Sequence, residues 1–133
     1  MSGPHPLVRL ETVLLIAVGG FAGSNLRYFV ELTIPSTLGA TFAVNVLGSF
    51  ALALILYEAS MIGALSDKSQ FVFGTGFLSS FTTFSTFVLD VVTADPLIGL
   101  GYIFASYVTG FAAVFLGRVV VHRVVAPRVE EVA

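Results

Sequence analysis

Charged residues divide this chain into four long apolar stretches. No charge lies between Glu11 and Arg27, and residues 32–57, 69–89 and 96–117 form three further uncharged runs. A helix needs about 20 mostly apolar residues to cross the hydrocarbon core of a bilayer. The pattern therefore predicts four membrane-spanning helices. We expect them at roughly residues 10–31, 38–57, 70–92 and 97–121.

The connections between these spans are short, and only residues 1–9 and 122–133 remain as polar tails. We expect a single transmembrane domain of all-α class. A β-barrel is disfavoured because no segment alternates polar and apolar residues. The first span is interpreted as a retained helix. Gly19 and Gly20 interrupt its apolar core, and no signal-cleavage site follows it.

Composition narrows the class of protein further. Of 133 residues, 56% are hydrophobic and 11% are charged, and mean hydropathy is +0.99. A soluble domain needs more polar surface than this, so a soluble enzyme is disfavoured. No basic cluster is present, which argues against a nucleic-acid partner. A multi-pass protein of the cell membrane that is not an enzyme is expected.

Small residues recur along the predicted helices and allow close backbone packing. They are Gly19, Gly20 and Gly23, then Gly39 and Ala43, then Gly110 and Gly117. A bundle of four spans has little room for an aqueous path within one copy. We therefore expect an oligomer whose function lies between copies.

Two polar residues inside the spans are candidates for function, as intramembrane polar residues generally are. Arg27 lies near the end of the first span, where its side chain either serves the site or extends to the lipid headgroups. Asn45 lies in the middle of the second span, on one helical face with Thr41 and Gly48. A hydrogen bond that only joins two helices is the alternative role for Asn45.

The third span contains six hydroxyl residues within positions 79–86. Such clusters bend or break helices, and irregular backbone at membrane depth survives only where it is buried or lines a cavity. A break frees carbonyl oxygens to bind a cation and a helix N-terminus to favour an anion. Phe84 and Phe87 share a face beyond this point, either as packing aromatics or as part of the site. On the fourth span, Tyr102, Ser106 and Gly110 form a stripe that either lines a path or packs.

Three motifs in this order resemble the Fluc fluoride channel family, also called CrcB. They are Gly19-Gly20-x-x-Gly23-x-x-x-Arg27-Tyr28, Thr41-x-x-x-Asn45-x-x-Gly48-Ser49 and Thr82-Thr83-Phe84-Ser85-Thr86-Phe87. The resemblance covers nearly the whole chain. It implies antiparallel dimers of four-helix subunits, with a break in the third helix and two fluoride pores at the interface.

The resemblance also implies roles for individual residues. A structural sodium ion would be held by the backbone carbonyls of Ser79 and Thr82. Arg27 would lie in a vestibule of the pore. The implied fluoride pore residues are Asn45, Phe84, Phe87, Thr41, Ser85, Thr86, Tyr102 and Ser106.

The chain departs from the family pattern at two places. Ser79-Ser80 replaces a frequent Gly-Gly pair, although a carbonyl ligand does not depend on its own side chain. Gly110 stands where some members carry another hydroxyl, so one polar step of the path is either missing or supplied by Thr109.

These residue types suit a small, strongly hydrated anion. Asn45 can offer two N–H donors and each Ser or Thr one O–H. Aromatic rings are positive at their edges, so Phe84 and Phe87 can stabilise an anion without formal charge. No Asp or Glu is expected in mid-span, which favours passive movement over pumping. The residues thus favour passive movement of an anion, and the family resemblance implies that this anion is fluoride leaving the cytoplasm.

Basic residues are distributed unequally between the two ends of the predicted bundle. The tails, the 58–69 connection and the end of the last span contain Arg9, Lys68, Arg118, Arg123 and Arg128, whereas Arg27 alone approaches the other side. This bias favours cytoplasmic termini. The partner is then either a second copy, as an antiparallel homodimer, or an oppositely oriented homologue.

Three rival functions fit less well. A small multidrug transporter is expected to use a mid-membrane carboxylate, whereas Glu11 and Glu31 lie at span ends. An assembly subunit explains the glycines but not the cluster of hydroxyls and phenylalanines. An intramembrane hydrolase needs a deep Ser–His or Asp pair, and His5 and His122 lie in the tails.

Overall fold

The structure is a computed structural model, and it describes residues 5–125, 127–128 and 131. Every regular element in these ranges is helical, as the sequence predicts, and two segments, η1 and η2, are π-helical. The elements are α1 (Pro6–Thr33), α2 (Thr37–Met61), α3 (Asp67–Gln70), η1 (Phe71–Leu78), α4 (Ser79–Phe81), α5 (Phe84–Thr93), α6 (Pro96–Val120) and η2 (Val121–Val125).

Four helical stretches are long and apolar enough to cross a membrane, and they confirm the four predicted spans. They are Pro6–Thr33, Thr37–Met61, Asp67–Thr93 and Pro96–Val125. Two boundaries were wrong, because residues 6–9 belong to the first helix and residues 122–125 continue the last one. The remaining predicted tail positions 1–4, 126, 129–130 and 132–133 lie outside the described residues.

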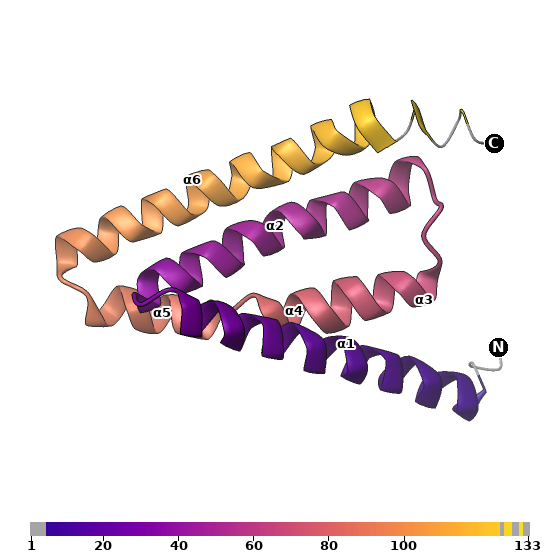
Figure 1. The fold of residues 1–133 in the computed structure, drawn as a ribbon, viewed down its shortest axis with the longest axis horizontal. Helices are drawn as coiled ribbons and strands as arrows, with labels where there is room; N and C mark the ends of the chain where they lie inside the picture. Colours follow the sequence, from indigo (N-terminus) through magenta and orange to yellow (C-terminus); the bar gives the residue numbers. More distant parts are fainter. Residues whose placement is uncertain (1–4, 126, 129–130, 132–133) are drawn as a thin grey trace.

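The spans form a slender bundle in which α2 packs along α6 and α1 packs along the third span. Figure 1 shows the start of α1, the α2–α3 connection and the end of α6 at one end of the bundle, with the α1–α2 and α5–α6 connections at the other. The basic residues of the tails and of α3 therefore share one end. Lys68 of α3 forms an ion pair with Glu11 of α1 there, with 2.6 Å between Nζ and Oε1.

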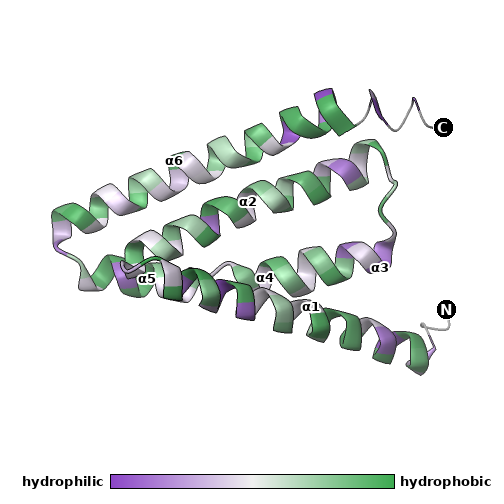
Figure 2. Cartoon of the chain, in the orientation of Figure 1, coloured by the Kyte–Doolittle hydropathy of each residue, from purple (hydrophilic) through white to green (hydrophobic). Residues whose placement is uncertain are grey.

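Large apolar side chains cover much of the outer surface. Phe21 and Phe111 are 74% and 73% exposed, and Figure 2 shows hydrophobic residues along every long helix. This degree of exposed apolar surface suits lipid or another membrane-embedded chain and is unfavourable in water.

The crossing of α1 and η1 depends on the glycines of the first span. A Cβ atom at Gly19 or Gly23 would collide with the backbone carbonyls of Val72 and Phe77. Small residues let helix backbones approach each other closely in a membrane, so the prediction is confirmed here. Within this chain, Gly39 and Gly110 show no such close approach, because a Cβ atom added at either would meet no neighbouring helix closer than 3.9 Å.

The turn after α2 is held by Glu58. Its Oε1 accepts hydrogen bonds from the backbone N–H groups of Ala64 (2.7 Å) and Leu65 (3.0 Å). Gly63 has a φ of +69°, a left-handed conformation that ends many helices and favours glycine. This turn brings α3 and the third span back into the bundle.

Candidate functional site

The third span is interrupted between α4 and α5. Thr82 (φ −82°, ψ 160°) and Thr83 (φ −148°, ψ 123°) are extended rather than helical. The hydroxyl of Thr82 donates to the carbonyl of Leu78 (2.9 Å), a pattern that bends helices. The Thr83 hydroxyl accepts from the N–H of Thr86 (3.2 Å) and so caps the new helix. The threonine pair thus ends one helix and starts the next.

Asn45 of α2 binds the interrupted backbone directly. Its Nδ2 donates to the Thr83 carbonyl (2.9 Å), and its Oδ1 accepts from the Thr83 N–H (2.8 Å). These bonds satisfy two backbone groups that no longer take part in a helix. The expectation that Asn45 offers two N–H donors to an ion is therefore wrong, because one of them is already used.

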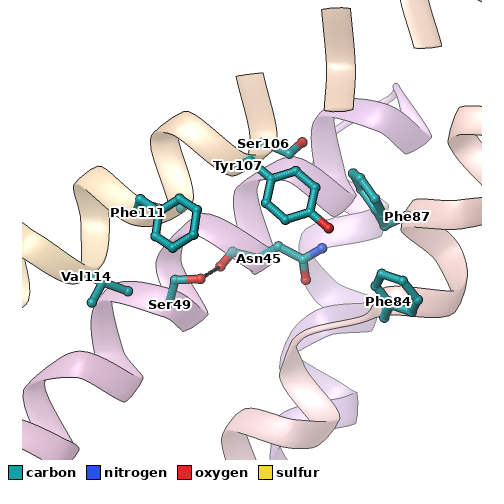
Figure 3. Close-up of a pocket in the computed structure, with 9 residues that line it drawn as sticks. Asn45, Ser49, Phe84, Phe87, Ser106, Tyr107, Phe111 and Val114 are labelled. Atoms are coloured by element: carbon teal, nitrogen blue, oxygen red, sulfur yellow. Dashed lines mark hydrogen bonds between the residues drawn. The ribbon is translucent and has the colours of Figure 1, made fainter. Parts of the chain in front are cut away.

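A groove of about 270 Å³ opens beside this break. Figure 3 shows side chains from α2, α5 and α6 surrounding it. The sequence-predicted residues Asn45, Phe84, Phe87 and Ser106 meet here, although they come from three helices. The full lining is Asn45, Ser49, Phe84, Phe87, Ser106, Tyr107, Gly110, Phe111 and Val114.

Phe87 is the centre of an aromatic cluster. Its ring is stacked with Phe84 at 6.0 Å, tilted against Tyr102 at 5.3 Å and perpendicular to Tyr107 at 6.3 Å between centroids. Phe87 is buried, whereas Phe84 is 72% exposed. The groove is therefore open on the side of Phe84.

Three of the predicted polar residues gather between α2 and the first half of α6. The Tyr102 hydroxyl lies beside the side chains of Thr41 and Ser106. Among the described residues, none forms a well-aligned hydrogen bond with the buried Tyr102 and Ser106 hydroxyl oxygens. Buried polar groups are normally paired, so these two hydroxyls are candidates to bind a ligand.

Asp90 is a residue that sequence analysis missed. Its side chain is 5% exposed and faces Tyr102, and its Oδ2 has no partner among the described residues. The sequence predicts no Asp or Glu in mid-span. Asp90 and Glu58 lie near the ends of their spans, yet both side chains are buried in the protein. The sequence did contain an indication of the position of Asp90. This residue follows Phe87 by three residues and therefore shares its helical face.

Other predicted residues lie outside the groove. The hydroxyls of Ser85 and Thr86 lie 3.4 and 2.9 Å from the hydroxyl of Thr83. These contacts place them in the hydrogen-bonded cap at the start of α5 and not in the groove lining. Thr109 donates to the Ala105 carbonyl of its own helix (2.6 Å), so the suggestion that it replaces the missing hydroxyl is wrong.

Arg27 is also separate from the groove and forms an ion pair with Glu31. The two side chains lie one helical turn apart on α1, with 3.6 Å between Nε and Oε1. Arg27 is about one-third exposed, so it lies neither deep in the protein nor fully in solvent. Its charge is partly neutralised before any anion approaches.

The backbone carbonyls of Ser79 and Thr82 are free of the usual helical bonds. The N–H of Thr83, which would reach Ser79, donates to Asn45 instead, and the N–H of Thr86, which would reach Thr82, donates to the Thr83 hydroxyl. Both residues line one groove between α2 and the third span. Carbonyl oxygens left unpaired where a helix breaks suit a monovalent cation, so these residues fit a sodium ion.

These features define a class of protein. A multi-pass helical protein with a broken span and unpaired hydroxyls at membrane depth is typical of proteins that move ions. Residues 14–118 match the family model described as CrcB-like protein, Camphor Resistance (CrcB). The chain belongs to this family and is a multi-pass membrane protein.

Curated relatives cover most of the chain. It is 50% identical over 121 residues to "Fluoride-specific ion channel FluC 1" of Haloarcula marismortui, covering 91% of this chain and 94% of the relative. It is 40% identical over 115 residues to "Fluoride-specific ion channel FluC 2" of Methanosarcina mazei, covering 86% and 90%. "Fluoride-specific ion channel FluC" of Thermosipho melanesiensis is 39% identical over 116 residues, covering 80% and 92%. These relatives are named as ion channels and not as enzymes.

Proposed function

We propose that this chain is a fluoride-selective channel that lets fluoride leave the cytoplasm passively. The observation that carries the proposal is the convergence of Asn45, Phe84, Phe87 and Ser106 on one groove. The names of its relatives support fluoride as the ion.

The chemistry of the groove suits an anion that must lose its water. Burying an unpaired ion costs tens of kcal/mol in the idealised limit, so hydrogen-bond donors must replace the hydration shell. In the groove the free N–H of Asn45 and the hydroxyl of Ser106 can donate, and the rings of Phe84 and Phe87 can present their positive edges. The Tyr102 hydroxyl lies beside Ser106, outside the groove lining. None of the described residues that line the groove is basic, so an anion is not bound too tightly to leave.

The groove is completed by a second chain in this proposal. Phe84 lines it while 72% exposed, so one subunit supplies only part of a closed path. An antiparallel partner would cover this open side and give two pores at the interface. The partner is a second copy or an oppositely oriented homologue, and the basic residues gathered at one end favour a single orientation for this chain.

A structural sodium ion fits the same interface. The carbonyls of Ser79 and Thr82 would hold it, with the equivalent pair from the second chain. The ion supplies positive charge that offsets the partial negative charge at the end of α4. Replacing sodium by N-methylglucamine should lower the melting temperature of the purified protein. Ser79→Ala should leave this sodium dependence unchanged, because it keeps the carbonyl.

Ion efflux from proteoliposomes tests the proposed function. Vesicles loaded with fluoride or with chloride should release only fluoride once potassium permeability is provided. Equal efflux of both anions, or none of fluoride, would overturn the proposal. The same experiment on this chain expressed alone tests the partner, since robust fluoride efflux would show that no second gene product is needed.

A further inference from the structure

Tyr107 contributes a side chain to the groove that the motifs do not include. It follows Ser106 on α6, so it lies about 100° around the helix from the stripe of Tyr102, Ser106 and Gly110. The structure nevertheless places Tyr107 in the lining of the same groove, together with Asn45. Figure 3 shows its ring directed from α6 toward Asn45 and Phe87.

The position of the Tyr107 ring is defined by Phe87. The two rings are perpendicular (87°), with centroids 6.3 Å apart, an arrangement that aromatic pairs prefer. Phe87 is itself buried, so it provides a fixed surface for this contact. A tyrosine has few rotatable bonds, and its hydroxyl is therefore held close to the groove at little entropic cost.

The wall formed by α6 needs a donor beyond Ser106. Gly110 lines the groove but has no side chain, and the Thr109 hydroxyl is used by the Ala105 carbonyl. Asn45 has one N–H left after its bond to Thr83. Between Ser106 and the apolar residues Phe111 and Val114, the Tyr107 hydroxyl is the side-chain donor that α6 adds to this lining.

We infer that Tyr107 is a pore-lining residue whose phenolic O–H donates a hydrogen bond to the permeating anion. The inference rests on the proposed function and adds a residue to its path. Tyr107, the free N–H of Asn45 and the edge of Phe87 then replace water around one position of the ion. A hydroxyl donor also favours small anions over large ones, because an anion with concentrated charge accepts a stronger hydrogen bond.

Tyr107→Phe tests this inference, because it removes the hydroxyl and keeps the ring against Phe87. The matched control is Tyr28→Phe on α1, which removes the hydroxyl of a similarly exposed tyrosine (60% exposed, against 54% for Tyr107) outside the groove. Fluoride efflux from proteoliposomes should fall about tenfold in Tyr107→Phe, the effect of about one hydrogen bond to a charged group. Tyr28→Phe should stay within about twofold of the wild type.

The outcomes separate this inference from the proposed function. A wild-type protein that conducts fluoride, with Tyr107→Phe equal to it, would overturn the inference alone. A wild-type protein that conducts no fluoride would overturn both. If Tyr107→Phe does not assemble, Tyr107→Asn and Tyr107→Leu decide the question: the donor in Tyr107→Asn should restore part of the flux that Tyr107→Leu loses, and equal loss in both would contradict a donor role.

Discussion

The side-chain amide of Asn45 and the backbone amide of Thr83 form a reciprocal pair of hydrogen bonds, at 2.9 and 2.8 Å. The pair joins the middle of the second span to the extended segment of the third. It satisfies a donor and an acceptor that would otherwise be unpaired at membrane depth, where an unpaired backbone group is unfavourable. Asn45 therefore has two roles, because it holds the break and still has one N–H directed elsewhere.

Asn45→Ala should lose stability as well as fluoride flux. Removing the amide leaves both backbone groups of Thr83 without partners, and we expect a loss of about 1–3 kcal/mol in stability. The measurements are the melting temperature in detergent and efflux from proteoliposomes. Asn25→Ala is the control, because Asn25 bonds only to Phe21 of its own helix and is exposed. An unchanged melting temperature in Asn45→Ala would contradict the structural role.

Replacing Phe84 or Phe87 by isoleucine should lower fluoride efflux in both cases, but only the change at Phe87 should lower the stability of the subunit. Phe87→Ile removes a buried ring with three aromatic neighbours and should cost about 1 kcal/mol or more. Phe84→Ile changes an exposed ring and should stay within about 0.5 kcal/mol in the isolated subunit.

The double variant with both phenylalanines replaced by isoleucine should abolish fluoride efflux while the protein still elutes as the wild type does. Phe104→Ile is a suitable control. Phe104 is also 72% exposed, and it does not line the groove. Undiminished efflux in the double variant would rule out the aromatic contribution to permeation.

Gly23→Ala should destabilise the crossing of α1 and η1. The added methyl group would meet the Phe77 carbonyl, a backbone group that cannot move aside easily, and overpacking of this kind costs about 1–3 kcal/mol. At Gly101 of α6 a Cβ atom meets nothing within 4 Å, so Gly101→Ala should be neutral or raise stability through helix propensity. Equal melting temperatures for the two variants would show that the crossing is looser than the structure indicates.

Glu31 should reduce the effect of Arg27 on anions. Because the two form an ion pair at 3.6 Å, Glu31→Gln should strengthen the attraction of fluoride and Arg27→Gln should weaken it. Both groups are partly exposed, so the changes should be modest, about twofold, and should diminish as ionic strength rises. The measurement is the initial rate of efflux against fluoride concentration at low and high concentrations of an impermeant salt. If the efflux rates of both variants depended on salt concentration in the same way, Arg27 would not contribute to attracting the anion.

Several properties followed from the order of the residues alone. The uncharged runs determined four spans, because the cost of placing charges in hydrocarbon leaves few alternatives. The cluster of hydroxyl residues located the interruption of the third span, because the relevant hydrogen bonds reach only three or four residues along the chain. The helix ends were less predictable. Residues 122–125 belong to η2, which continues the last span beyond its predicted end.

Other properties depended on contacts between distant residues. The sequence shows Asn45 as a polar residue but not that Thr83, 38 positions away, uses one of its donors. It shows Asp90 near a span end but not that the side chain is buried against Tyr102. Periodicity along α6 places Tyr107 and Ser106 on different faces, yet both line the groove.

The sequence by itself therefore determined the membrane class, the number of spans, the position of the break and the residue types available for an anion. Only the tertiary structure decided which donors remain free, which carboxylates are buried and which side chains share the groove. The physical reason is that hydrophobic burial and local hydrogen bonds are set by neighbours along the chain. Pairing at membrane depth instead depends on how α2, α5 and α6 approach one another in space.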